Sequence, residues 1–327
     1  MDSTTATHGK EMVSEIPTYI RVFNDGTVER PRQAPFVPPS LQHPNTPLSS
    51  KDILISHNPS ISARLYLPNS ILPTKLPILL YFHGGGFFFE SAFSQLYHSH
   101  FTAFLSHLHL LVVSVDYRLA PEHPLPAAYD DCWASLQWLA SHFTPNNPTN
   151  SDQWLIDHGD STRIFIGGDS AGGNIVHNIA MRAGSEALPG GVKILGAIYS
   201  HPYFYSSQPI GSEPRDIDNE KSFLGLVWKL VYPSAPGGID SFVINPMAPG
   251  APSLAGLGCS KMLICVAGKD KLRDRGVWYY EGVKQSGWEG KLELFEEEGE
   301  DHVYHIFNPE SENGKKMIQR LASFIFE

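Results

Sequence analysis

Short, almost continuously apolar runs recur along the chain after residue 76. They cover residues 77–82, 110–115, 163–167, 194–199 and 262–267. Runs of this length predict strands that are covered on both faces, which is typical of a parallel sheet. Two earlier segments, residues 52–56 and 63–67, alternate apolar and polar positions and predict a pair of antiparallel strands.

Stretches with the helical spacing of apolar residues lie between and after these runs. They cover residues 92–107, 127–142, 171–183, 219–231, 276–286 and 314–326. Strands and helices therefore alternate, and crossovers between parallel strands are right-handed. This pattern predicts an α/β fold with a mostly parallel central sheet and helices on both of its faces.

Two segments fall outside this alternation. Residues 1–50 are rich in Pro, Ser and Thr and have weak periodicity, which predicts a partly ordered N-terminal arm or a cap. Residues 202–250 hold many Pro and Gly residues around one helical stretch, so they are a candidate lid. We expect an arm or cap over residues 1–50 and a main domain over residues 51–327 that carries this lid.

Charge and cysteine content exclude several classes of protein. The 327 residues include 34 acidic and 24 basic side chains, a net charge of −10, so we expect no nucleic-acid and no membrane partner. The three cysteines have no zinc-ligand spacing, and we expect no metal. The first twenty residues lack the apolar core of a secretory signal, so we expect a cytoplasmic protein. Nothing in the composition indicates an oligomeric state.

The first motif that carries chemistry is G-x-S-x-G at residues 168–172, between a predicted strand and a predicted helix. In this context the motif predicts a tight turn that exposes the hydroxyl of Ser170 as a nucleophile. Small flanking residues are needed because the turn strains the backbone. The structural alternative is a glycine-rich junction in which Ser170 caps the helix.

The second motif is His83-Gly84-Gly85-Gly86, at the end of another predicted strand. Successive glycines allow backbone N–H groups to approach a substrate oxygen that a Cβ atom would keep away. Gly85 and Gly86 are therefore candidates for one side of an oxyanion hole, and the N–H of Ala171 is the candidate for the other. The alternative is a flexible turn.

These motifs, together with DYRLAPE at residues 116–122, resemble the hormone-sensitive-lipase-like branch of the α/β-hydrolases. More narrowly, the chain is similar to plant carboxylesterases, from about residue 20 to residue 326. The resemblance implies an α/β-hydrolase fold with a catalytic domain over residues 51–327. It also implies a cap formed by the N-terminal arm and the insertion near residues 202–250.

The resemblance also implies a catalytic triad in the chain order Ser, acid, His. The family's acid corresponds to Asp270, which follows the predicted strand at residues 262–267, and Asp274 is the competitor. A carboxylate just past the end of a strand can orient an imidazole, whereas Asp274 should already lie on a helix, where its charge suits the helix N-terminus. The family's base corresponds to His302, which would take the proton of Ser170.

Other aromatic and histidine residues have two readings. Phe87, His201, Tyr203 and Tyr304 are candidates to line a substrate pocket, but aromatic residues at strand ends also belong to cores. His177, His201 and His305 are otherwise expected to be packing residues.

The resemblance implies a serine carboxylesterase that acts on a small-molecule ester and needs no cofactor. It implies two alternatives of the lyase type. The plant 2-hydroxyisoflavanone dehydratases resemble the same branch, and some of them carry Thr at the nucleophile position, where this chain has Ser170. Related cyclases of alkaloid pathways are a further version of this alternative.

A binding protein is the alternative from another class. The gibberellin receptors of plants have a similar fold in which the triad histidine is lost. His302 is present in this chain, and the N-terminal arm does not show the pattern of a long helical lid. Both features favour an enzyme.

Overall fold

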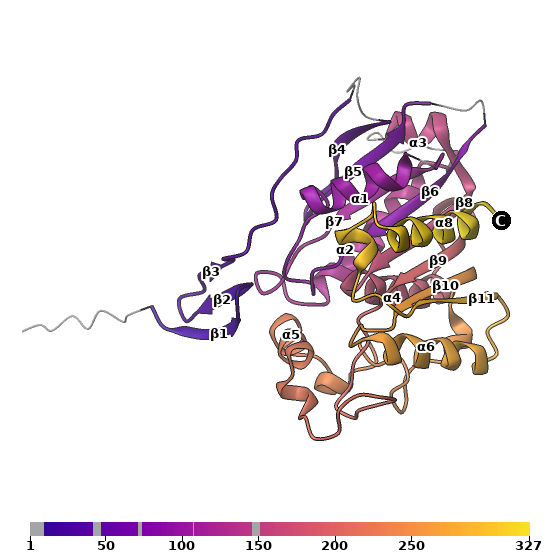
Figure 1. The fold of residues 1–327 in the computed structure, drawn as a ribbon. Coiled ribbons are helices and arrows are strands. Elements are labelled where there is room, and N and C mark those ends of the chain that lie inside the picture. Colours follow the sequence, from indigo (N-terminus) through magenta and orange to yellow (C-terminus); the bar gives the residue numbers. More distant parts are fainter. Residues whose placement is uncertain (1–9, 42–46, 71–73, 107, 146–150) are drawn as a thin grey trace, which may run out of the picture.

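The computed structural model describes residues 10–41, 47–70, 74–106, 108–145 and 151–327. Residues 1–9 and 42–46 of the predicted arm therefore lie outside the described residues. An eight-stranded sheet forms the centre of the described part, and helices cover both of its faces (Figure 1). This arrangement confirms the predicted α/β class.

The central sheet is mixed but mostly parallel. Its strands are β4 (Leu48–His57), β5 (Ser60–Pro68), β6 (Leu76–Phe82), β7 (Leu111–Asp116), β8 (Gly159–Asp169), β9 (Ile194–Ser200), β10 (Cys259–Ala267) and β11 (Lys291–Glu297). They lie in the order β11-β10-β9-β8-β6-β7-β5-β4. β4 and β5 form the predicted antiparallel pair, β5 is antiparallel to β7, and the remaining neighbours are parallel. Every apolar run predicted as a strand lies in this sheet.

Two hydrophobic cores lie on opposite faces of the sheet. The helices are α1 (Gln95–Leu105), α2 (Ala127–Ser141), α3 (Gln153–His158), α4 (Ala171–Ser185), α5 (Phe223–Val231), α6 (Arg273–Gln285), α7 (Tyr304–Phe307) and α8 (Glu312–Phe326). Along β6, Ile78 and Leu80 pack with α2, α4 and α6, while Leu79 and Tyr81 pack with α1 and α8. Side chains of a strand alternate between its faces, so β6 contributes to both cores. Both faces of the central strands are buried, which explains why these strands appear in the sequence as continuous apolar runs.

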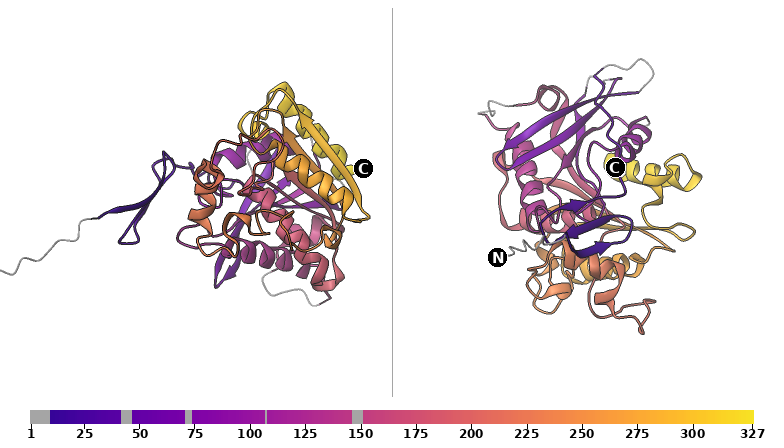
Figure 2. Two further views of the ribbon diagram at one scale, coloured as in Figure 1. Left: turned by 90° about the horizontal axis from the view of Figure 1, so that it is seen from below. Right: turned by 90° about the vertical axis from the view of Figure 1, so that its left-hand side faces the viewer.

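The N-terminal arm is more ordered than the sequence predicts. β1 (Met12–Ile16), β2 (Ile20–Phe23) and β3 (Val28–Glu29) form a small antiparallel sheet. Ile16 and Ile20 are buried in the larger core, and β1 contacts α5 of the insertion. The right-hand view of Figure 2 shows the arm, in indigo, next to the orange insertion.

An arginine fastens the arm to the main domain. Arg30 donates to both carboxylate oxygens of Glu122 at 2.6 Å. It also donates to the backbone oxygens of Phe88 and Ala120, each at 2.9 Å. Phe88 follows the glycine-rich loop, so this one side chain couples the arm to the loop where the oxyanion hole is predicted.

A second, buried arginine fastens the insertion. Arg275 of α6 is fully buried and pairs with both carboxylate oxygens of Glu213 at 2.6 Å. It also donates to the hydroxyl of Ser206 and to the backbone oxygen of Gln208. The insertion therefore lies against α6 through polar side chains. None of the helices formed by the described residues is long and apolar enough to cross a membrane.

Candidate active site

Ser170 occupies a strained turn between β8 and α4. Its backbone has φ 52° and ψ −115°, a conformation that few residues other than glycine adopt. A Cβ atom on Gly172 would lie 1.9 Å from the carbonyl oxygen of Phe82, and one on Gly168 would lie 2.5 Å from the backbone of Gly172. The turn therefore requires glycine at both positions. The side chain of Ser170 makes no capping hydrogen bond to α4, which excludes the helix-capping alternative.

The glycine-rich loop follows β6 and lines the same cavity as Ser170. Gly85 and Gly86 have φ values of 96° and 62°, and both contribute to the cavity wall. A Cβ atom on Gly85 would lie 2.2 Å from the carbonyl oxygen of Phe89, so no larger residue fits without a shift of the backbone. The loop is therefore a fixed turn.

His83 begins the glycine loop, and Ala171 carries the other N–H of the predicted oxyanion hole. His83 is fully buried, and its ring stacks on the ring of Tyr117 with centroids 4.2 Å apart. The hydroxyl of Tyr117 donates to the carbonyl oxygen of His83 at 2.7 Å, which fixes the start of the loop. Ala171 is the first residue of α4, so its N–H has no acceptor within the helix.

A buried carboxylate supports the loop from behind. Asp169 accepts hydrogen bonds from the hydroxyls of Tyr81 (2.8 Å) and Tyr97 (2.9 Å). The N–H of Gly84 donates to Asp169 at 3.1 Å and to the Tyr97 hydroxyl at 2.6 Å. Burial raises the pKa of Asp169 to about 6, although the hydrogen bonds from both tyrosines act to lower it. The sequence analysis missed this role, although the residue stands inside the nucleophile motif.

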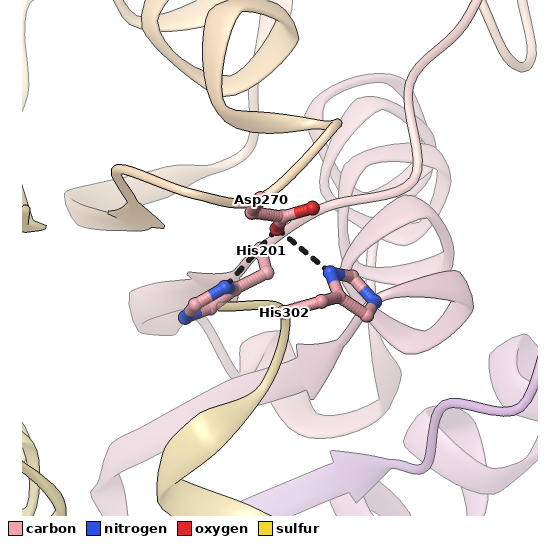
Figure 3. A group of neighbouring side chains, drawn as sticks. All are labelled: His201, Asp270 and His302. Carbon is pink, nitrogen blue, oxygen red and sulfur yellow. Dashed lines mark hydrogen bonds and ion pairs between the residues drawn. The ribbon is translucent and has the colours of Figure 1, made fainter. Parts of the chain in front are cut away.

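The carboxylate beside His302 is that of Asp270, not that of Asp274. His302 Nδ1 lies 2.7 Å from Asp270 Oδ2, and the N–H of Leu272 donates to Asp270 Oδ1 at 2.9 Å (Figure 3). Asp274 lies in the first turn of α6, as predicted, but it accepts hydrogen bonds from the N–H and hydroxyl of Ser212 in the insertion. Asp274 thus helps to hold the insertion.

Nearby carboxylates raise the pKa of His302. Burial lowers the pKa of this imidazole, but the hydrogen bond and charge of Asp270 outweigh burial, with further contributions from Asp169 and Asp301. The pKa of His302 therefore lies above its ordinary value of 6.5.

A cavity of about 1030 Å³ joins these groups. Ser170, Asp270 and His302 line it together with the glycine loop, and we call these parts the floor. Other parts of the wall come from the arm and the insertion, residues 10–32 and 202–250, which we call the cap. Tyr19 and Phe223 of the cap line the cavity. Most of the accessible wall is apolar, so the cavity suits a small organic molecule.

The pocket candidates divide into two groups. Tyr203 and Tyr304 line the cavity. Phe87 does not, because its ring is buried in the core against Tyr129 and Trp228, and Phe88 and Phe89 line the cavity instead.

The prediction that His201 lines the pocket is also wrong. Its side chain is fully buried, and its Nδ1 lies 3.2 Å from Asp270 Oδ2 (Figure 3). It is neither a pocket residue nor an ordinary packing residue. His177, by contrast, is buried beside the hydroxyl of Tyr279, as expected for packing.

One group of side chains in the described part of the chain has the composition of a metal site: His201, Asp270 and His302. Two of its three ligand atoms, His302 Nδ1 and Asp270 Oδ2, are only 2.7 Å apart. Ligands bound at about 2.0–2.2 Å in a tetrahedral zinc site lie roughly 3.3 Å apart. The short contact fits a shared proton better than a metal.

The sheet order agrees with the class of protein that the sequence motifs predict, and the serine turn and the imidazole–carboxylate pair line one cavity. A family model described as the alpha/beta hydrolase fold matches residues 79–306, and the chain belongs to this family. Its likeness to the plant carboxylesterase group, predicted from the motifs, is confirmed by its relatives.

Two plant relatives and one solved structure illustrate this likeness. The chain is 57% identical to a 2-hydroxyisoflavanone dehydratase of Glycyrrhiza echinata over 325 residues, covering 99% of each chain. It is 43% identical to probable carboxylesterase 7 of Arabidopsis thaliana over 306 residues, covering 93% of this chain and 95% of the relative. An esterase of Pyrobaculum calidifontis superposes with a TM-score of 0.67 at 27% identity, covering 86% of each chain.

Proposed function

We propose that the protein is a serine carboxylesterase that hydrolyses esters of small organic molecules. The observation that carries this proposal is the placement of Ser170 on a strained turn that opens into one cavity with the glycine loop and the His302–Asp270 pair. A strained serine turn of this kind, beside an imidazole held by a carboxylate, is suited to nucleophilic attack.

The mechanism follows from the roles of these groups. His302 Nε2 takes the proton of the Ser170 hydroxyl while its oxygen attacks the ester carbonyl. The N–H groups of Gly85, Gly86 and Ala171 stabilise the oxyanion. His302 then gives its proton to the departing alcohol, and water, activated by the same imidazole, releases the acid. No step needs a cofactor.

A second candidate is loss of water from a 2-hydroxyisoflavanone. The 57% identity to a dehydratase over nearly the whole chain favours it. In such a reaction His302 would remove the proton on the carbon next to the carbonyl, and the oxyanion hole would hold the enolate. The enolate would expel the hydroxyl on the neighbouring carbon, which would leave as water after taking the proton back from His302. Ser170 would not act as a nucleophile.

These two reactions make different demands on Ser170, which gives a direct test. Hydrolysis of p-nitrophenyl acetate and butyrate is measured beside dehydration of a 2-hydroxyisoflavanone, for the wild type, Ser170→Ala and His302→Gln. An esterase loses about 10⁴-fold or more of its ester turnover in both variants. A dehydratase loses its activity in His302→Gln and keeps most of it in Ser170→Ala.

The outcomes separate the hypotheses. Ester turnover that depends on Ser170, with no isoflavone formed, supports the carboxylesterase. Dehydration far faster than ester turnover supports the second candidate. If the wild type acts on neither substrate but binds gibberellin tightly, the proposal of an enzyme is wrong.

A further inference from the structure

We infer that His201 is a positioning residue for Asp270, donating a second hydrogen bond to the carboxylate oxygen that binds His302. The Nδ1 atoms of His201 and His302 lie 3.2 Å and 2.7 Å from the same atom, Asp270 Oδ2 (Figure 3). The inference rests on the proposed function of Asp270 and His302 as the acid and base of the triad.

The fold holds His201 rigidly at this place. The residue follows β9 directly with φ 50°, and its N–H donates to the carbonyl oxygen of Cys265 on β10 at 2.8 Å. Its ring stacks on the ring of His305 with centroids 5.5 Å apart. The side chain is fully buried and does not line the cavity, so it cannot touch a substrate. Any effect on the reaction therefore passes through its neighbours, above all Asp270.

The surroundings of the ring decide which nitrogen carries the proton. Nδ1 lies 3.2 Å from Asp270 Oδ2, and the N–H of Val303 is directed at the same Nδ1 from 3.3 Å, while the buried Nε2 has no hydrogen-bond partner. A proton on Nε2 would leave a buried donor unpaired and would direct the lone pair of Nδ1 at a carboxylate oxygen. A proton on Nδ1 leaves Nε2 unpaired and removes the acceptor of the Val303 N–H, but it makes a charge-assisted hydrogen bond to the Asp270 carboxylate, which is stronger than the neutral bond from Val303. The second tautomer is therefore favoured.

Both carboxylate oxygens of Asp270 then accept hydrogen bonds. Oδ2 accepts from the two imidazoles, and Oδ1 accepts from the N–H of Leu272 at 2.9 Å. Burial acts to raise the pKa of Asp270, but the hydrogen bonds from His201 and His302 hold it below its ordinary value. The carboxylate stays ionised and fixed in orientation when His302 accepts the serine proton.

Several titratable groups face His201, and a test must allow for them. Asp270 follows β10, and Asp301, His302, Tyr304 and His305 lie between β11 and α8. Burial lowers the pKa of His201, although Asp270 acts to raise it, so the ring is neutral near pH 7. A change at His201 thus alters a neutral hydrogen-bond donor.

Three variants separate positioning from packing. His201→Leu removes the donor at similar volume, and His201→Asn keeps a donor close to the position of Nδ1. His177→Leu is the matched control, because His177 is also a buried histidine, in α4, with Nδ1 2.9 Å from the Tyr279 hydroxyl. Measurements are kcat, KM and the pH profile of kcat/KM for p-nitrophenyl butyrate.

We expect His201→Leu to lower kcat by about tenfold to a hundredfold, as is typical when the partner that orients a functional side chain is lost. KM should change little. The carboxylate without its second donor is more basic, so the acid limb of kcat/KM should move to higher pH. His201→Asn should restore kcat to within roughly threefold of the wild type. His177→Leu should lose stability without a shift of the pH profile.

A spectroscopic measurement tests the tautomer without a mutation in the measured protein. In ¹⁵N-histidine-labelled wild type, the Nδ1 of His201, assigned by its absence in His201→Asn, should resonate as a protonated nitrogen. An unprotonated Nδ1, or a folded His201→Leu with wild-type kcat and pH profile, would overturn the inference. If the wild type shows no Ser170-dependent turnover, the proposed function fails, but the nitrogen spectrum still decides the hydrogen bond.

Discussion

The floor and the cap of the cavity are built by different kinds of interaction. In the floor, backbone approaches backbone so closely that a Cβ atom on Gly172 would lie 1.9 Å from a carbonyl oxygen. The cap is held by side chains far apart in sequence, such as the pairs Arg30–Glu122 and Arg275–Glu213. Close backbone contact leaves almost no freedom to substitute, whereas side-chain pairs can be exchanged.

This difference assigns separate tasks to the two regions. Under the proposed function, the floor fixes where a proton and an oxyanion are held, and the cap supplies part of the apolar wall that contacts the substrate. Relatives named as a dehydratase and as a carboxylesterase both align along nearly the whole of this chain. We therefore expect substitutions in the floor to act on kcat and substitutions in the cap to act on KM.

Apart from the variants of Ser170 and His302, the largest effect is expected from Gly85→Ala in the floor. The new Cβ atom would lie 2.2 Å from the carbonyl oxygen of Phe89, at a φ of 96° that disfavours alanine. The loop must shift, and its N–H groups then no longer point at the oxyanion. We expect kcat for p-nitrophenyl butyrate to fall by about 10²–10³-fold, the typical loss of one oxyanion donor.

Gly26→Ala in the arm is the matched control for backbone strain. Gly26 has φ 82°, but a Cβ atom there would have no neighbour within 4 Å. This variant should lose about 1 kcal/mol of stability, measured by thermal unfolding, and keep its kcat. Equal losses of kcat in the two variants would show that strain, not oxyanion geometry, is responsible.

Residues of the floor should also determine the pH dependence of kcat/KM. His302 must be neutral to accept the serine proton, and its pKa lies above 6.5. The rate constant kcat/KM should therefore rise about tenfold per pH unit below this pKa and level off above it. Asp169 contributes to raising the pKa of His302, so Asp169→Asn should move the midpoint to lower pH.

Cap variants should leave the midpoint of the pH profile unchanged, because no cap residue is among the charged groups that shift the pKa of His302. The pH profile of Tyr19→Ala serves as the comparison. A midpoint that stays unchanged in Asp169→Asn would contradict the assignment of Asp169 as a charge acting on His302.

The sequence predicted the floor well, because short motifs specify it. The serine turn is formed by consecutive residues, and so is the glycine loop. Local geometry requires the glycines of both. Asp169 was missed because the motif does not tell where the residue before the serine points. His201 was misplaced because its partner, Asp270, is 69 positions away, and only the parallel pairing of β9 with β10 brings the ends of both strands together.

The cap was predicted only in outline, for a related reason. β1, β2 and β3 have 5, 4 and 2 residues, too short for an alternating pattern to stand out. Their order comes from contacts with distant parts of the chain, such as Arg30 with Glu122. Such contacts leave no mark on local periodicity.

The smallest effect is expected from the cap itself, in Tyr19→Ala. The ring of Tyr19 lies 6.1 Å from that of Phe88, 5.7 Å from that of Phe89 and 6.2 Å from that of Phe223, and it lines the cavity. Its removal opens the wall, and aromatic contacts of this kind contribute about 0.5–1.5 kcal/mol. KM for a bulky aromatic ester should therefore rise roughly threefold to tenfold, while kcat changes by less than about twofold.

p-Nitrophenyl acetate, which has a smaller acyl group, should be affected less by Tyr19→Ala than the bulky ester. Tyr19→Phe keeps the ring but loses the hydrogen bond from Arg32, 2.9 Å from the Tyr19 hydroxyl, and should behave like the wild type with both esters. A fall of kcat at constant KM in Tyr19→Ala would contradict the division of tasks, because it would mean that the arm sets the geometry of the floor. Arg30 offers a path for such coupling through the backbone of Phe88, so this result would direct attention to that contact.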